Sequence, residues 1–280
     1  MRYRIDLAYD GTDFFGWQIQ PKVRTVQEEV EKALGVLLKE TVGVVGAGRT
    51  DTGVSATFYV AHFDCSDAGV DCAQLRYKLN AILPKSVCII NVAPAAPDFH
   101  ARFDARLRQY CYYLHRVKDP FLEGRSYYFA YPEVDFEKMN EAASRLVGTH
   151  DFSCFEKSGG DNKTSICTVY RAFWEPCEPL VRAGIPLIMP APVPGPSGMA
   201  LPGYEVSYWR FVIEADRFLR NMVRAIVGTL LEVGRGRRYL HDFDALILPP
   251  DASDGLRESR RSLAGESAPA PALYLTDIRY

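Results

Sequence analysis

The sequence predicts an α+β fold with a mostly antiparallel central sheet and flanking helices. Two observations carry this prediction: runs with alternating apolar residues, typical of half-buried strands, and intervening runs with apolar residues at helical spacing. The chain has 280 residues, of which 48% are apolar and 24% charged, an ordinary balance for a globular protein. A formal charge of −2 excludes an overall polycation. Binding to nucleic acid would therefore depend on local clusters of Arg and Lys.

The first third of the chain predicts the order β, α, β, β, α, β. Residues 2–9 alternate as a strand, and Thr25-Val-Gln-Glu28 is a capping box that begins a helix of about 14 residues. Further elements are expected as strands at 42–45, 56–63 and 87–92, and as a helix at 71–82. This order resembles the ferredoxin-like unit, whose sheet face is a recurring platform for RNA.

The remaining chain predicts a second set of strands and helices. We expect strands at 99–103, 107–116, 165–174, 204–214 and 272–280, and helices after Asp135, from 217 and around 241–248. Residues 157–163 are Ser/Gly/Asn-rich, which predicts a loop, and residues 249–271 predict a loop with little structure. Proline is dense at 178–203, which cannot pair within a central sheet. We interpret this stretch as an elongated hairpin or excursion without a catalytic role.

One carboxylate stands out in the stretch Gly46–Ala56. Asp51 lies between glycines at 46, 48 and 53, which permit positive φ and close approach of a ligand. Arg49 supplies a planar charged fork suited to phosphate. These residues alone fit a polar turn between two strands equally well. A phosphate loop is less favoured, because no Gly-Lys-Ser/Thr follows the glycines.

A second concentration of charge lies at 217–228, where a helix is expected. Arg217, Arg220 and Arg224 are spaced i, i+3 and i+7, which places them on one side of that helix above a buried apolar stripe. No acidic residue follows them until Glu232, whereas a solvated helix face normally mixes both signs of charge. The row therefore favours a role toward anionic RNA or a carboxylate.

The composition does not favour a metal site, a disulfide framework or a membrane protein. The seven cysteines contain no Cys-x-x-Cys pair, and the five histidines show no i, i+4 pairing. We expect reduced core thiols and no metal or other cofactor. No apolar stretch reaches the length of a membrane span, so we expect a cytoplasmic protein without a membrane partner.

Four motifs resemble those of the tRNA pseudouridine synthase A family, and together they extend over most of the chain. They are Tyr9-Asp-Gly11 with Gly16-Trp-Gln18, Gly48-Arg49-Thr50-Asp51-x-Gly53-Val54, Phe99-His-Ala-Arg-Phe103 followed by Tyr110, and Phe218-x-Arg-x-Met-Val-Arg224. The second has six fixed residues in seven. Residues 178–203 and 249–271 lie outside the resemblance.

The resemblance implies a role for each of four residues. Asp51 would be the catalytic residue, and Arg224 would pair with it. Tyr110 would stack on the uracil base. Arg49 would hold an RNA phosphate or occupy the space of a base taken out of the stack. No cofactor is implied.

The resemblance also implies the architecture, the substrate and the partners. Two ferredoxin/RRM-like halves, 1–105 with the catalytic loop and 106–280 with the insertion at 178–203, would form one pseudouridine synthase core. The substrate would be tRNA, with uridines modified at positions 38 to 40 of the anticodon stem-loop by a homodimer. Ser55 stands where most bacterial members have His, a form closer to eukaryotic relatives that modify other tRNA positions. Modification of another position therefore stays an alternative.

Two other classes of function remain compatible with the residues. A non-catalytic RNA-binding module of the same fold would use the aromatic residues and arginines without needing Asp51. A glycosidase acting on a nucleoside would require a second catalytic acid, which the spacing does not place near the motif.

Overall fold

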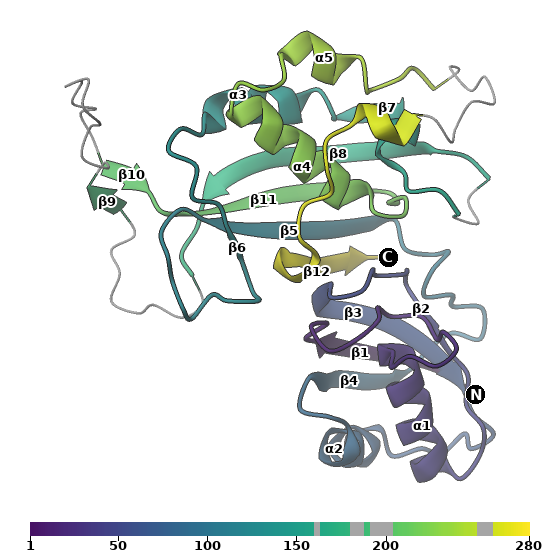
Figure 1. Ribbon diagram of the computed structural model, residues 1–280. Coiled ribbons are helices and arrows are strands. Elements are labelled where there is room, and N and C mark those ends of the chain that lie inside the picture. The colour runs from purple at the N-terminus through teal and green to yellow at the C-terminus, as the bar shows by residue number, and fades with distance from the viewer. Residues whose placement is uncertain (160–162, 180–187, 191–203, 251–259) are drawn as a thin grey trace. The chain divides into compact units, whose positions relative to one another are not determined.

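The computed structural model describes residues 1–159, 163–179, 188–190, 204–250 and 260–280, and these form the predicted α+β fold (Figure 1). Parts of the predicted loops at 157–163 and 249–271, and most of the insertion at 178–203, lie outside the described residues. Two compact units divide the chain. Unit 1 comprises Met1–Tyr110, Glu214–Arg217 and Leu273–Tyr280, and unit 2 comprises Cys111–Ile213 and Phe218–Ala272.

Unit 1 holds the first ferredoxin-like run of elements and the last strand. Its elements are β1 Arg2–Tyr9, α1 Val26–Leu38, β2 Val44–Gly46, β3 Ser55–Asp64, α2 Cys72–Ile82, β4 Val87–Pro94 and β12 Leu273–Arg279. The strand order is β4-β1-β3-β12. Strand β1 pairs antiparallel with both β3 and β4, whereas β12 pairs parallel with β3. The first residues of β5, Leu107–His115, and the end of β11, Tyr208–Ala215, also belong to this unit.

Local sequence signals begin the two helices of unit 1. The Thr25 hydroxyl accepts a hydrogen bond from the Glu28 amide, so the predicted cap begins α1, which has 13 residues. Asp71 caps α2 in the same way through the amide of Gln74. Along β1, Ile5 and Leu7 are fully buried, as the alternation predicts. These residues form the core that supports the neighbouring loops.

Unit 2 contains the helices of the second half. Its remaining elements are β6 Tyr127–Tyr128, α3 Phe136–Ser144, β7 Gly148–Asp151, η1 Ser153–Phe155, β8 Ile166–Pro176, β9 Ile188–Pro190, β10 Tyr204–Val206, α4 Met222–Gly234, α5 Leu240–Asp244, η2 Arg261–Leu263 and η3 Ala270–Ala272. The strand order is β5-β11-β8-β7. Helices α3 and α4 lie on one face of these strands (Figure 1). Asp135 caps α3, as predicted.

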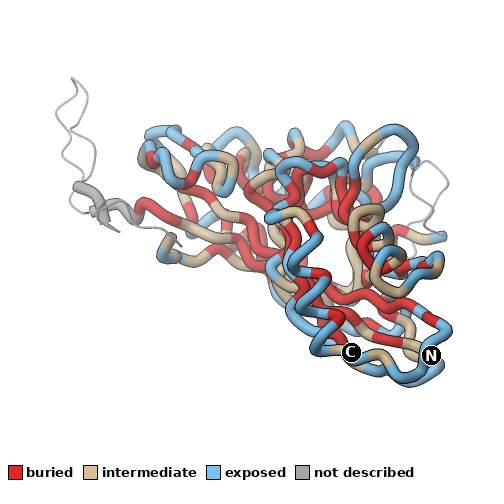
Figure 2. The backbone as a smooth tube through the Cα atoms, turned by 90° about the horizontal axis from the view of Figure 1, so that it is seen from below, coloured by how far each residue is buried: buried red, intermediate tan, exposed pale blue. Residues whose placement is uncertain are grey.

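Burial follows the sheets. Figure 2 shows long buried runs along the strands and exposed residues at loops and outer helix faces. Within the Pro-rich insertion, Ile188–Pro190 pairs antiparallel with Tyr204–Val206 just after it, Ile188 with Val206 and Pro190 with Tyr204, as expected of a hairpin. Among the described helices, none is both long and apolar enough to cross a membrane.

The strand predicted at 99–103 is wrong. These residues form a turn, in which the His100 ring nitrogen Nδ1 accepts the amides of Arg102 and Phe103. The amide of His100 in turn donates to Asp104. Side-chain to backbone bonds of this kind compete with strand pairing, and residue alternation does not reveal them.

Candidate active site

The stretch that contains Asp51 is a loop between β2 and β3 in unit 1, as predicted. Asp51 is half-buried, and Arg49 is exposed. Thr50, between them, is buried, and its hydroxyl lies 2.9 Å from the Tyr9 phenol oxygen. The amide of Val54 donates to the Asp51 carbonyl and closes the turn. The loop therefore presents Asp51 from a rigid base.

The loop that follows β1 packs against the backbone of the Asp51 loop. Gly16 has a φ of +87°, and a Cβ added there would overlap the carbonyl oxygen of Thr50. The Trp17 amide donates to that carbonyl at 3.3 Å, and the Gly53 amide donates to the Phe14 carbonyl at 3.2 Å. Only glycine satisfies both the backbone conformation and the close approach at position 16. The Gly-Trp-Gln motif thus has a structural role beside Asp51.

The glycines of the loop itself act differently from the expectation that all three permit positive φ. Of Gly46, Gly48 and Gly53, only Gly53 has a positive φ, of 79°. Gly46 instead admits the Trp17 ring and the Tyr59 hydroxyl, which a Cβ would overlap. Gly48 has no atom this close to an added Cβ. Gly53 therefore serves turn geometry and Gly46 serves packing, whereas neither requirement applies to Gly48.

A cluster of buried aromatic rings fills the space beneath the loop. Trp17 and Tyr59 stack at a centroid distance of 4.1 Å, and Tyr9 meets Tyr59 edge-on at 5.6 Å. The Tyr59 hydroxyl donates to the Gly48 carbonyl. Burial raises the pKa of Tyr9 and of Tyr59 well above the usual value, so both phenols stay neutral. The Asp51 loop is bound to this cluster through Gly48 and Thr50.

The structure brings Tyr110 near Asp51 within unit 1. Tyr110 lies on β5 and is 9% exposed. Burial raises its pKa, the Asp51 charge raises it further, and the Arg108 charge lowers it. A half-buried carboxylate beside a neutral phenol can act as a nucleophile or a general base, while the phenol can help to transfer a proton.

Reasoning from sequence missed Arg108, the cation next to this pair. Its guanidinium donates to several backbone carbonyls, including that of Ala47 at 2.9 Å in the Asp51 loop. A signal was present, because Arg108 and Tyr110 are two residues apart on a strand and so share a face.

The predicted row of three arginines is wrong. Helix α4 begins only at Met222, and Asn221 before it has a left-handed φ of 64°. Arg217 and Arg220 therefore precede the helix, and only Arg224 lies on it. Helical spacing does not apply across a left-handed residue.

Arg224 is anchored within unit 2 to the irregular segment before β12. Its Nε donates to the Ala268 carbonyl at 2.7 Å, and the Ala268 amide returns a bond to the Arg224 carbonyl at 3.0 Å. The side chain is half-buried. Ala264, Gly265 and Ala268 are buried, so these residues of the 249–271 segment pack against the rest of unit 2. Asp51, Arg49 and Tyr110 belong to unit 1, and Arg224 to unit 2.

Ser55, the residue that departs from the bacterial pattern, is buried at the start of β3. Its hydroxyl accepts the Gly11 amide at 3.0 Å. A Cβ at Gly11 would overlap the Val54 carbonyl, so the chain after β1 lies directly against the end of the Asp51 loop. The contact of Ser55 therefore helps to join these two loops.

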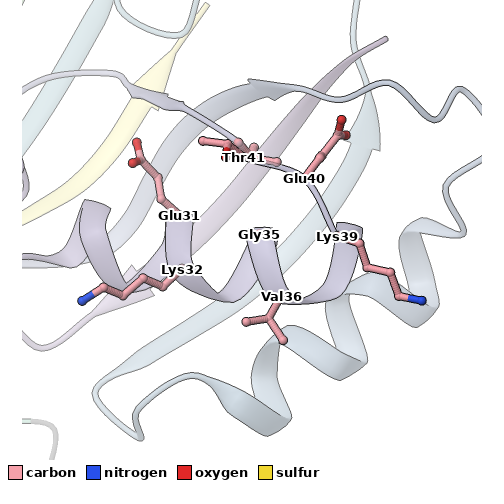
Figure 3. Close-up of a pocket in the computed structure, with 8 residues that line it drawn as sticks. Glu31, Lys32, Gly35, Val36, Lys39, Glu40 and Thr41 are labelled. Carbon is pink, nitrogen blue, oxygen red and sulfur yellow. The ribbon is translucent and has the colours of Figure 1, made fainter.

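A pocket on unit 1 lies apart from the candidate residues. The pocket in Figure 3 is lined by the second half of α1 and the residues after it, and it includes none of the four candidate residues. Its side chains carry both signs of charge, with Glu31 and Glu40 beside Lys32 and Lys39. Among the described residues, no three His, Cys, Asp or Glu side chains are grouped to hold a metal ion.

Comparison with known proteins gives a consistent result along the whole chain. The model of a family described as tRNA pseudouridine synthase matches residues 7–104 and 142–280. The tRNA pseudouridine synthase A of Bacteroides fragilis is 43% identical over 281 residues, which cover 100% of this chain and 96% of that protein. Proteins of the same name from Bacteroides thetaiotaomicron and Porphyromonas gingivalis are each 44% identical over 280 residues, with 90% and 97% of their lengths covered. The chain belongs to the tRNA pseudouridine synthase family.

Proposed function

We propose that this protein isomerises uridine to pseudouridine in tRNA, with Asp51 as the catalytic residue. In this reaction the C1′–N1 bond breaks, the uracil rotates while bound, and a C1′–C5 bond forms. The proton on C5 leaves to solvent, and N1 gains a proton. The isomerisation is redox-neutral, so its chemistry requires no redox cofactor.

The observation that carries this proposal is the half-buried Asp51 carboxylate close to the neutral Tyr110 phenol. A carboxylate on a braced loop can attack C1′ or act as a base on the ribose. A buried neutral phenol suits a role in stacking on the base and in transferring the C5 proton. Names of relatives that match over the full chain support tRNA as the substrate.

Arg224 and Arg49 complete the proposed site. We assign Arg224 as the counter-ion that keeps Asp51 ionised when a pocket excludes water, because an opposite charge within contact range favours the charged form. Arg49 is exposed next but one to Asp51. That placement suits either contact with an RNA phosphate or insertion into the space that a flipped base leaves in the stack.

The proposal extends to position, assembly and location. We propose uridines 38 to 40 of the anticodon stem-loop as targets, a homodimer as the active species, and the cytoplasm as the compartment. The N-terminal half, 1–105, would supply the catalytic loop, and the C-terminal half, 106–280, would supply Arg224. Light scattering on the purified protein gives the oligomeric state directly.

Release of tritium from tRNA labelled at C5 of uridine tests the function. An isomerase releases tritium to water, whereas an RNA-binding module or a hydrolase of the glycosidic bond does not. Release with pseudouridine in the digested product supports the proposal, and tight tRNA binding without release contradicts it. The same assay on individual tRNA transcripts, each with U38, U39 or U40 replaced by cytidine, identifies the position.

A further inference from the structure

Arg108 joins three segments of unit 1 that are far apart in the sequence. It lies on β5, two residues before Tyr110. Its guanidinium donates only to backbone carbonyls in the bonds observed: Nη2 to Ala47 at 2.9 Å and Arg102 at 2.7 Å, Nη1 to Asp216 at 2.7 Å and Ala105 at 3.1 Å, and Nε to Ala47 at 3.3 Å. The three segments are the Asp51 loop, the turn after β4 and the residues after β11.

The contact with Ala47 fixes the entrance to the Asp51 loop. Ala47 is 1% exposed, and its amide donates to the Val60 carbonyl at 2.9 Å, while its carbonyl accepts both Nε and Nη2 of Arg108. The peptide groups of this residue are thus held from β3 on one side and from β5 on the other. Any shift of Arg108 would move the backbone four residues before the Asp51 carboxylate.

The geometry suits an arginine and no other cation. Five donors in one rigid plane can reach carbonyls in several directions, whereas the ammonium of lysine offers three donors at a single point. Burial lowers the pKa of Arg108, which shows that enclosing the charge opposes its ionisation. A half-buried charge such as that of Arg108 is stabilised where its hydrogen bonds offset the lost solvation.

We infer that Arg108 is a positioning residue for pseudouridine formation, holding the Asp51 loop in register with the strand that carries Tyr110. The inference rests on the proposed function. Arg108 acts on the reaction through Asp51 and Tyr110 and does not itself touch the substrate. A displacement of the carboxylate by about 1 Å is enough to slow such a reaction by about 100-fold.

The test compares the same substitution at two positions two residues apart. Arg108→Lys keeps the charge but removes the planar fork, and Arg106→Lys makes the same change at an exposed residue. The rate of pseudouridine formation is measured in a single turnover with saturating enzyme, together with the Kd for tRNA and the thermal midpoint of unfolding. We expect the single-turnover rate of Arg108→Lys to fall by about 30- to 100-fold. Its Kd should stay within about threefold of wild type, and Arg106→Lys should match wild type in rate.

The split between rate and binding decides the outcome. An unchanged rate in Arg108→Lys, or a loss that a higher enzyme concentration fully restores, would overturn the positioning role. If Arg108→Lys does not fold, Arg108→Gln replaces it, because Gln removes the half-buried charge. A folded Arg108→Gln with normal binding and slow chemistry supports the inference, and failure of both variants to fold overturns it in favour of a purely structural role. Wild type and Arg106→Lys that both lack activity would instead reject the proposed function itself.

Discussion

The Asp51 loop and the Arg224 segment bring their functional side chains into place by different means. In unit 1 the loop is enclosed by backbone contacts from several segments, and glycines permit the closest approaches. In unit 2 a single left-handed residue, Asn221, begins a helix, and one reciprocal pair of bonds with Ala268 anchors Arg224. The Asp51 loop is closely packed, so added atoms should destabilise it. The position of the Arg224 segment depends instead on the left-handed backbone conformation of Asn221. Substitutions in the two regions should therefore differ in kind as well as in size.

The largest loss of stability is expected at Gly16. Gly16→Ala adds left-handed strain and an overlap with the Thr50 carbonyl, which together should lower the free energy of unfolding by about 3 kcal/mol or more. Gly124→Ala is the matched control, because Gly124 also has a positive φ, of 69°, but open space around it. That change should cost about 1 kcal/mol. Equal losses in urea denaturation would show that strain alone, without packing, explains Gly16.

Arg224 should be the most sensitive residue of unit 2 in activity. Arg224→Lys keeps the charge but not the planar fork, so we expect the single-turnover rate to fall by about 10- to 100-fold. Arg145→Lys on the C-terminal end of α3, where the side chain pairs with exposed Glu141, serves as the control and should retain the wild-type rate. A nearly wild-type rate in Arg224→Lys would remove the proposed pairing with Asp51.

Asn221 separates backbone strain from hydrogen bonding in unit 2. Its Nδ2 donates to the Ser267 hydroxyl at 2.6 Å. Asn221→Ala should lower the free energy of unfolding by about 1–2 kcal/mol, through left-handed strain and the lost bond. Asn221→Gly keeps the φ and should lose about half as much, because only the bond to Ser267 is removed. If Asn221→Gly and Asn221→Ala have the same free energy of unfolding, the left-handed φ at position 221 does not contribute to stability.

Two buried tyrosines give the smallest contrast. The Tyr9 phenol is bonded to Thr50, whereas the Tyr112 hydroxyl has no partner among the described residues. Near pH 7, Tyr9→Phe should lower the free energy of unfolding by about 1 kcal/mol, and Tyr112→Phe should leave it unchanged or raise it slightly. A destabilised Tyr112→Phe would contradict this difference.

The same tyrosines predict a dependence on alkaline pH. Burial raises the pKa of both phenols, so above about pH 10 the unfolded chain loses protons that the folded protein retains. The contribution of each phenol to the free energy of unfolding is therefore fully present below about pH 10. It falls as pH rises, by up to about 1.4 kcal/mol per pH unit for each phenol. Each Phe variant should show a shallower decline than wild type, measured by denaturation at several pH values.

Much of the fold was predictable because its signals are local. Thr25, Asp71 and Asp135 cap the helices that were expected after them, and alternation along β1 gave its buried face. The turn at 99–103 and the start of α4 were not predicted correctly. In both, backbone conformation depends on side-chain bonds or on a left-handed residue, which neither periodicity nor composition contains.

The candidate site was predictable only in part, for the same physical reason. The resemblance named Asp51 as a candidate, and it named Tyr110 by its distance of seven residues from Phe103. Arg108 was missed because its partners are carbonyls of Ala47, Arg102, Ala105 and Asp216, and a carbonyl is present at every residue. When a cation binds backbone carbonyls, no particular residue type in the sequence indicates its partners.

Asp51→Asn removes the carboxylate that we propose as the catalytic group. The change preserves size and removes the charge, so the variant should fold and bind tRNA with a Kd close to that of wild type. Its single-turnover rate of pseudouridine formation, measured by tritium release from C5-labelled tRNA, should fall by at least about 1,000-fold. A folded Asp51→Asn variant that forms pseudouridine at the wild-type rate would show that Asp51 is not the catalytic residue.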